Sequence, residues 1–196
     1  MANPAYIDSD GVLTDGEAWV PIQSIEPTAN FEWASTDDGQ VGDWSQYMDL
    51  KIIGYYRETG TSNVNTNLTM NFNNASIDFS YQIFRGDGTN DTAISGSSNG
   101  RWDPGEGCGG GADANCFAGV VIDIFDINSG KYKSSVATGG SPAEANTGTS
   151  DYVTLHTSTW QSQAPITAID FWFRYGGTFA AGSRFDLFGI LPRMVA

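Results

Sequence analysis

The sequence has few cationic residues and no long apolar run, and both shortages exclude classes of function. Nine Lys and Arg residues stand against twenty-three Asp and Glu residues, which gives a formal net charge of −14. Such an acidic chain repels nucleic acids and anionic membranes, so we expect neither as a partner. No stretch approaches the roughly 20 apolar residues of a transmembrane helix, and the start, MANPAYIDSDG, lacks the regions of a signal peptide. We therefore expect synthesis in a cytoplasm without signal-directed export.

Histidine and cysteine are also scarce. The sequence contains one histidine, His156, and two cysteines, Cys108 and Cys116, which share one Gly-rich segment. A zinc site needs about four such ligands, so we predict none. The spacing leaves open both a loop-closing disulfide between the cysteines and a pair of reduced thiols. On strand alternation His156 shares a face with Thr154 and Ser158, and we predict an exposed or sheet-edge histidine.

Acidic residues are too numerous to identify a catalytic pair on their own. A glycosidase needs two carboxyl groups about 5–10 Å apart, and Asp103 with Glu106 is one candidate pair, but chance pairs are inevitable among so many acids. We expect no Gly-x-Ser-x-Gly elbow, and a single histidine in a predicted strand gives a Ser/His/Asp triad little further support. Turns at 8–11, 36–39 and 86–91 offer carboxylates to calcium, although turn chemistry explains each of them. We predict no enzyme, no metal site and no cofactor.

Glycine and aromatic residues are plentiful, whereas helical spacing of apolar residues is absent. The 24 glycines and 13 % aromatic residues favour an all-β fold with many turns. Alternation predicts a hairpin of 68–72 with 79–84, a closing hairpin over 165–190, and a long irregular loop over 85–119. We predict an antiparallel, jelly-roll-like β-sandwich of about eight strands over 17–196, after an N-terminal arm over 1–16. Further strands are predicted at 17–25, 47–57, 120–127, 131–136 and 152–156.

Five motifs occur in order along about 150 residues. They are WSQYMDLKIIGYYR, NLTMNFNN followed by FSYQ, DIFDINSGKYKS, TWQSQAPITAIDF and TFAAGSRFDLFGI. From Trp44 onward the chain resembles a β-sandwich module of small tailed-bacteriophage virion proteins, which include head decoration (cement) proteins and tail-fibre ends. The segment GRWDPGEGCGGGADANC and the acidic residues before Trp44 lie outside this resemblance.

The resemblance implies a non-enzymatic structural protein of a phage virion. The most direct role is a decoration protein that stabilises the head by bridging capsid subunits. Its partners would then be the major capsid protein and copies of itself, in a homo-oligomer such as a trimer. The alternative is a tail-tip or fibre module that binds a host surface glycan. The resemblance transfers no catalytic residues.

Aromatic residues in polar segments are the candidate partner contacts, because aromatic side chains concentrate at interface hot spots. Trp102 lies between Arg101 and Asp103 in a Gly-rich segment, where it either stacks on a sugar ring or pins the segment to its own sheet or a neighbouring subunit. We favour pinning. Trp33, beside Phe31, is a second contact candidate.

Overall fold

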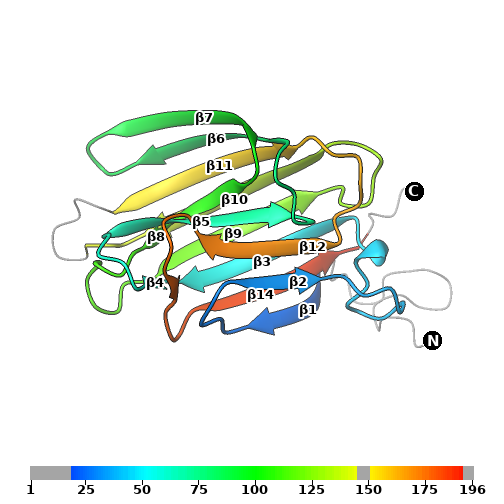
Figure 1. Cartoon of the computed structure of the whole chain (residues 1–196), viewed down its shortest axis with the longest axis horizontal. Coiled ribbons are helices and arrows are strands. Elements are labelled where there is room, and N and C mark those ends of the chain that lie inside the picture. Colours follow the sequence, from blue (N-terminus) through cyan, green and yellow to red (C-terminus); the bar gives the residue numbers. More distant parts are fainter. Residues whose placement is uncertain (1–18, 145–150, 192–196) are drawn as a thin grey trace.

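The computed structural model describes residues 19–144 and 151–191, which form fourteen β-strands and one 3-10 helix (Figure 1). The predicted arm over 1–16 lies outside the described residues. None of the described residues belongs to a helix long and apolar enough to cross a membrane. The elements are β1 (Trp19–Ile25), β2 (Phe31–Ala34), η1 (Trp44–Gln46), β3 (Asp49–Tyr56), β4 (Glu58–Thr59), β5 (Asn65–Phe72), β6 (Phe79–Gly86), β7 (Asp91–Asn99), β8 (Trp102–Cys108), β9 (Ala118–Phe125), β10 (Lys133–Ser141), β11 (Tyr152–Trp160), β12 (Ala168–Phe173), β13 (Thr178–Phe179) and β14 (Arg184–Ile190).

The strands form two antiparallel layers. An eight-stranded sheet has the order β1-β14-β3-β9-β10-β11-β6-β7, and a four-stranded sheet has the order β2-β12-β5-β8. The four-stranded sheet lies in front of the larger one in Figure 1, and β6 and β7 extend past its edge. A short pair, β13 with β4, joins the layers at one end. The prediction of an all-β antiparallel sandwich is confirmed, whereas the predicted number of about eight strands was wrong.

The core lies between the two sheets and is rich in aromatic rings. Alternate residues of β3 and β9 point inward, as expected for strands with one covered face. Phe171 of the smaller sheet stacks on Phe31, with ring centres 5.1 Å apart, and Tyr56 of the larger sheet stacks on Phe185 at 5.6 Å. Gly54 makes this packing possible, because a Cβ atom there would lie 2.5 Å from the Phe185 ring. The absence of a side chain at Gly54 therefore leaves the space that the Phe185 ring occupies.

Both predicted hairpins were wrong. β5 belongs to the four-stranded sheet and β6 to the eight-stranded sheet, so 68–72 and 79–84 lie in opposite layers. The same holds for β12 and β14, which the predicted closing hairpin over 165–190 had joined. Alternation identifies a strand and its buried face, but it carries no information on which sheet the strand enters. The short connections here cross between layers.

The predicted irregular loop over 85–119 was also wrong over much of its length, since it contains β7 and β8. β8 pairs with β5 and is buried at every residue. A strand with both faces covered loses the alternation by which strands are recognised.

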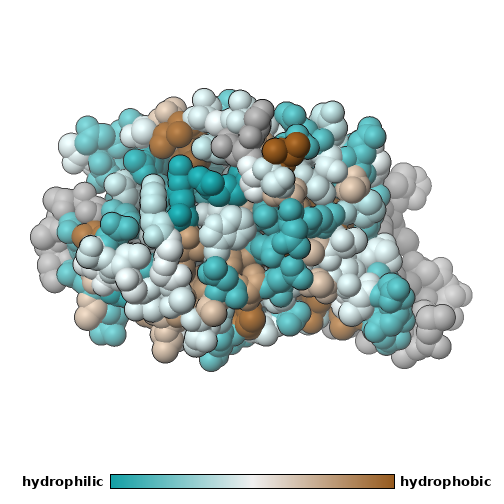
Figure 2. All heavy atoms as spheres, viewed as in Figure 1, coloured by the Kyte–Doolittle hydropathy of each residue, from teal (hydrophilic) through white to brown (hydrophobic). Residues whose placement is uncertain are grey.

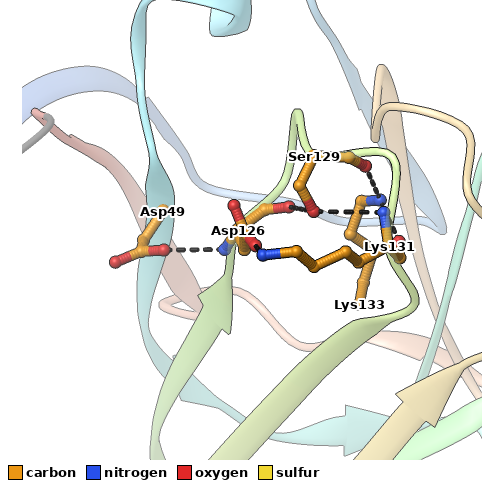
Figure 3. Close-up of polar contacts among 5 residues, drawn as sticks. All are labelled: Asp49, Asp126, Ser129, Lys131 and Lys133. Atoms are coloured by element: carbon orange, nitrogen blue, oxygen red, sulfur yellow. Dashed lines mark hydrogen bonds and ion pairs between the residues drawn. The ribbon is translucent and has the colours of Figure 1, made fainter.

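The turn between β9 and β10 is held by a buried lysine (Figure 3). Lys133 is fully buried, and its Nζ donates to the carbonyl oxygens of Ser129 at 2.5 Å and Lys131 at 2.6 Å. Asp126 adopts a φ of 58° at the end of β9, and its backbone N–H donates to Asp49 Oδ1 at 2.7 Å. These contacts satisfy the polar groups of a turn that packs against β3.

Candidate functional site

Polar side chains form a row across the outer face of the four-stranded sheet. Glu32 on β2 pairs with Asp170 on β12, which in turn pairs with Asn71 on β5. The three residues alternate with core residues of their strands, so they share the outward face. Figure 2 shows hydrophilic side chains over β5 and β12 on this side of the molecule. They contribute to a pocket of about 370 Å³, called the outer pocket below, which is lined by Asn30, Phe31, Glu32, Asn71, Asn74, Asp170, Phe171 and Trp172.

The two carboxyl groups of the outer pocket come from paired residues, and Glu32 affects the acidity of Asp170. Burial, a side-chain interaction with Glu32 and the charge of Glu32 together raise the pKa of Asp170 from the ordinary 3.8 to about 6. Asn74 Nδ2 donates to Glu32 Oε2 at 3.4 Å. Within residues 19–144 and 151–191, no Lys, Arg or His forms an ion pair with either carboxyl group. The pair is therefore a concentration of negative charge that the fold leaves without a cation.

Neighbouring carboxylates on the same sheet are instead neutralised by arginine. Asp103 accepts from Thr69 Oγ1 at 2.8 Å and from Arg174 Nη1 at 2.9 Å, and Arg101 lies 3.8 Å away. Burial nevertheless raises the pKa of Asp103, against the lowering effect of these partners. The second such carboxylate, Glu106, bonds to Arg85 at 2.8 Å, and burial raises its pKa as well.

Asp103 and Glu106 are therefore buried structural residues that form ion pairs with arginines. Their exposed fractions are 2 % and 5 %, which leaves no room for a substrate to reach them.

His156 is in the core, and the predicted exposed position was wrong. Its side chain is fully buried, and neither ring nitrogen has a hydrogen-bond partner among the described residues. Burial lowers the pKa of His156 to about 4. The face that it shares with Thr154 and Ser158 is the inner face of β11, because β8 covers it. The prediction that the three residues share a face was correct, but that face is the inner one and not the exposed one.

The predicted partner contacts divide by burial. Trp33 is 1 % exposed and Trp102 is 0 % exposed, so both belong to the core, and Asp103 is held by Arg174. The prediction that these three side chains contact a partner directly was therefore wrong. Of the two roles predicted for Trp102, the structure agrees with pinning, because its ring is buried in its own sandwich. Phe31 is half-buried and lines the outer pocket, and Arg101 is partly exposed at the edge of the same sheet.

Cys108 and Cys116 are free, buried thiols. Burial raises the pKa of Cys108, whose Sγ lies 3.5 Å from Ser141 Oγ. The loop between the cysteines is fixed by two adjacent residues that follow β3. Glu58 is fully buried and accepts from the Gly110 N–H at 2.8 Å. The Arg57 guanidinium donates to four carbonyl oxygens of the loop, those of Gly110, Ala112, Asp113 and Cys116.

The opposite surface, the outer face of the eight-stranded sheet, combines polar residues such as Ser80, Gln82 and Thr157 with one largely apolar row. A cross-strand row runs over six adjacent strands, and in register it contains Ile53, Val121, Thr138, Leu155, Phe84 and Ala93. We call it the apolar row. Ile53 is 38 % exposed, Leu155 44 % and Phe84 54 %. Exposed apolar side chains gathered on one face are typical of interaction surfaces.

No family model, curated protein or solved structure matches this chain. Function must therefore be argued from the two surfaces. In the described part of the chain, no three His, Cys, Asp or Glu side chains come together as a metal site. Residues 96–100 read Gly-x-Ser-x-Gly, a pattern that the sequence reasoning overlooked, but β8 follows them where a nucleophile elbow requires a helix.

Sequence reasoning missed the outer pocket. Glu32, Asn71 and Asp170 are far apart in the sequence, and only strand pairing brings them together. One local signal was available: Trp172 and Asp170 share the polar face of β12, where a large aromatic ring is unexpected.

Proposed function

We propose that this chain is a non-enzymatic structural protein of a tailed-bacteriophage virion. In the form that we favour, it is a decoration protein that binds the outside of the head and bridges major capsid subunits. The phage context rests on the resemblance of the segments from Trp44 onward. The docking role rests on one observation, the apolar row on the outer face of the eight-stranded sheet.

The apolar row is long enough to carry a docking contact. Strands lie about 4.8 Å apart, so a row over six strands extends for about 24 Å. The backbone that carries these side chains is already fixed by strand pairing, which reduces the backbone entropy lost on binding. Burial of a large apolar side chain contributes about 1.5–3 kcal/mol, and Ile53, Phe84 and Leu155 are each more than a third exposed.

The net charge favours a different protein over a second copy as the first partner. Two copies with a formal charge of −14 each repel one another, whereas a neutral or basic capsid surface does not. A homo-oligomer such as a trimer is part of the proposal. We expect it to assemble on the capsid, where the lattice holds the copies together against this repulsion.

The outer pocket favours the alternative, a tail-tip or fibre module that adsorbs to a host surface glycan, because it combines an indole ring with carboxyl and amide groups. Copy number separates the two roles. A decoration protein is present in many copies per particle, in a fixed ratio to the major capsid protein, whereas a tail module is present in few.

A pair of variants tests the docking surface. Phe84→Lys with Leu155→Lys places two charges in the apolar row at cross-strand neighbours. We expect this variant to lose co-sedimentation with empty capsids while its unfolding transition stays cooperative. Thr59→Lys with Thr178→Lys adds the same charge to a paired, exposed position in β4 and β13, and it should bind normally. Equal binding by both variants would contradict docking through the apolar row.

A further inference from the structure

We propose that the outer pocket binds a neutral saccharide, with the Trp172 ring against an apolar face of the sugar and Glu32 with the neighbouring amides on its hydroxyl groups. The site lies on the four-stranded sheet, away from the apolar row of the other sheet. It is therefore independent of the proposed docking surface, and its failure would leave the docking proposal standing.

The size of the pocket fits a small part of a glycan. Its volume of about 370 Å³ lies at the lower end of the range of about 300–1,000 Å³ found for small-molecule sites. The walls come from three adjacent strands, β2, β12 and β5, and from the turn that follows β5. A site built mainly on paired strands keeps its shape without a ligand, which lowers the cost of binding.

The reachable polar groups suit hydroxyl groups. Glu32, Asn30 and Asn74 are exposed side chains at the pocket, and together they offer both hydrogen-bond acceptors and donors. A sugar hydroxyl donates one hydrogen bond and accepts others, so it needs such a mixture. Asn74 already donates to Glu32, which orients the carboxylate for a ligand.

The aromatic wall supplies the apolar part of recognition. Trp172 is half-buried on a sheet face that is otherwise polar. It pairs with Thr69 on one side, and Asn30 lines the pocket on the other side. An indole ring buries a large apolar area while its edge remains wet, which is the requirement for a ligand with one apolar face and several hydroxyl groups. Phe31 also lines the pocket, but its ring packs inward against Phe171, so Trp172 supplies the aromatic contact.

The charge of the site selects against anionic sugars. Glu32 and Asp170 have no cation partner among the described residues, in contrast to Asp103 and Glu106 on the same sheet. A sialylated or sulphated sugar would meet this negative pair, whereas a neutral sugar would not. Calcium is the rival ligand, but it requires about six to eight oxygens, and among the described residues no third acidic side chain joins this pair.

The test is binding of the whole chain to a panel of neutral oligosaccharides and their sialylated counterparts, followed by titration calorimetry with the best neutral probe. We expect neutral probes to bind, sialylated ones to bind more weakly, and both Trp172→Ala and Glu32→Gln to weaken binding about tenfold or more. Trp19→Ala removes a tryptophan that is 44 % exposed on the other sheet, and it should leave the affinity unchanged.

Three outcomes would overturn the proposal. They are failure of every probe to bind, binding that Trp172→Ala and Glu32→Gln both leave intact, and calcium binding in a titration with CaCl2 alone that Glu32→Gln abolishes while no saccharide binds. Glu32→Gln preserves the shape of an exposed side chain, so it stays informative if Trp172→Ala fails to fold. Because the two sheets carry the two sites, loss of saccharide binding by these variants should leave capsid binding unchanged, which separates failure of this inference from failure of the docking proposal.

Discussion

At the scale of residues, the interior of the sandwich contains ionisable groups that cost stability. His156 is fully buried, and both of its ring nitrogens lack hydrogen-bond partners among the described residues. A polar group buried in this way costs about 1–3 kcal/mol even when it is uncharged. A proton on the ring would add a buried charge, so the position is also sensitive to acid.

We expect His156→Leu to flatten the pH dependence of stability between pH 6.5 and 4. The folded pKa of about 4 lies below the ordinary 6.5, so the unfolded chain binds the extra proton as the pH falls through this window. The stability linked to neutral His156 is complete above pH 6.5 and declines towards pH 4, by about 3 kcal/mol in total. Urea unfolding at several pH values measures the difference between variant and wild type.

His156→Gln is the control, because it keeps a polar side chain that cannot titrate. It should flatten the same window as His156→Leu while lying below it in stability at pH 7. If wild type and both variants lose stability in parallel between pH 6.5 and 4, the histidine does not cause the acid sensitivity.

The pKa shift of Asp170 has the opposite effect on the pH dependence of stability. Its folded pKa of about 6 lies above the ordinary 3.8, so the native state holds the extra proton between these values. The stability linked to that proton is complete below pH 3.8 and is lost as the pH rises through 6. Asp170→Asn should therefore stabilise the protein at pH 7 by about 1 kcal/mol after solvent screening, with no gain below pH 4. Chemical unfolding at pH 7 and pH 4 tests this.

Glu32→Gln removes the other carboxyl group of the pair, and its stability is compared with that of Asp170→Asn and of the double variant. Because each variant alone relieves the pair, the double variant should gain much less than the sum of the two. A strictly additive gain would mean that the two carboxyl groups do not interact.

At the scale of elements, strand positions were predictable and strand partners were not. The pattern of residues 47–57 located β3 to within two residues, because every second side chain there is apolar and buried. β8 was missed because WDPGEGC has the proline, glycine and acid content of a loop. It becomes a strand through pairing with β5 and through arginines from β6 and from the end of β12 that neutralise its two acids.

Like β8, the loop between the cysteines is held by an arginine that is distant in the sequence, Arg57. Arg57 donates to carbonyl oxygens of Gly110, Ala112, Asp113 and Cys116, so its removal leaves several acceptors without partners. We expect Arg57→Met to reduce the free energy of unfolding by about 2–4 kcal/mol and to expose the two thiols. Denaturation with urea measures the first effect, and the rate of alkylation of Cys108 and Cys116 under native conditions measures the second.

Arg184→Met serves as the comparison. Arg184 is exposed and bonds only to Asp186, two residues away, so its loss should cost well under 1 kcal/mol and leave alkylation slow. Slow alkylation in Arg57→Met as well would show that the loop is held by other contacts.

At the scale of the whole molecule, the two sheets present different chemistry to the outside. The larger sheet carries the apolar row beside polar residues such as Ser80, Gln82 and Thr157, whereas the smaller sheet carries polar rows and the outer pocket. Sequence reasoning found the residues of both, such as Phe84 in one predicted strand and Phe31 in a polar segment. It could not assemble either surface, because each is made by pairing between strands that are remote along the chain.

The overall charge is the last global property with a measurable consequence. Eight of the nine Lys and Arg residues lie in the described part of the chain; six form ion pairs with carboxylates, while Arg57 and Lys133 bond to carbonyl oxygens. No described cation is thus left to offset the remaining acids, whose mutual repulsion opposes the compact state.

Added salt should therefore stabilise this protein. Raising NaCl from about 10 to 150 mM shortens the Debye length from about 30 to 8 Å, which screens repulsion between surface acids more than it weakens the partly buried ion pairs. We expect the free energy of unfolding to rise by about 1–2 kcal/mol, measured by urea unfolding at each concentration. CaCl2 at matched ionic strength should have the same effect if screening alone acts, and a larger effect would identify specific cation binding. A fall in stability with NaCl would mean that the six ion pairs, and not the excess of acids, dominate the electrostatics of the fold.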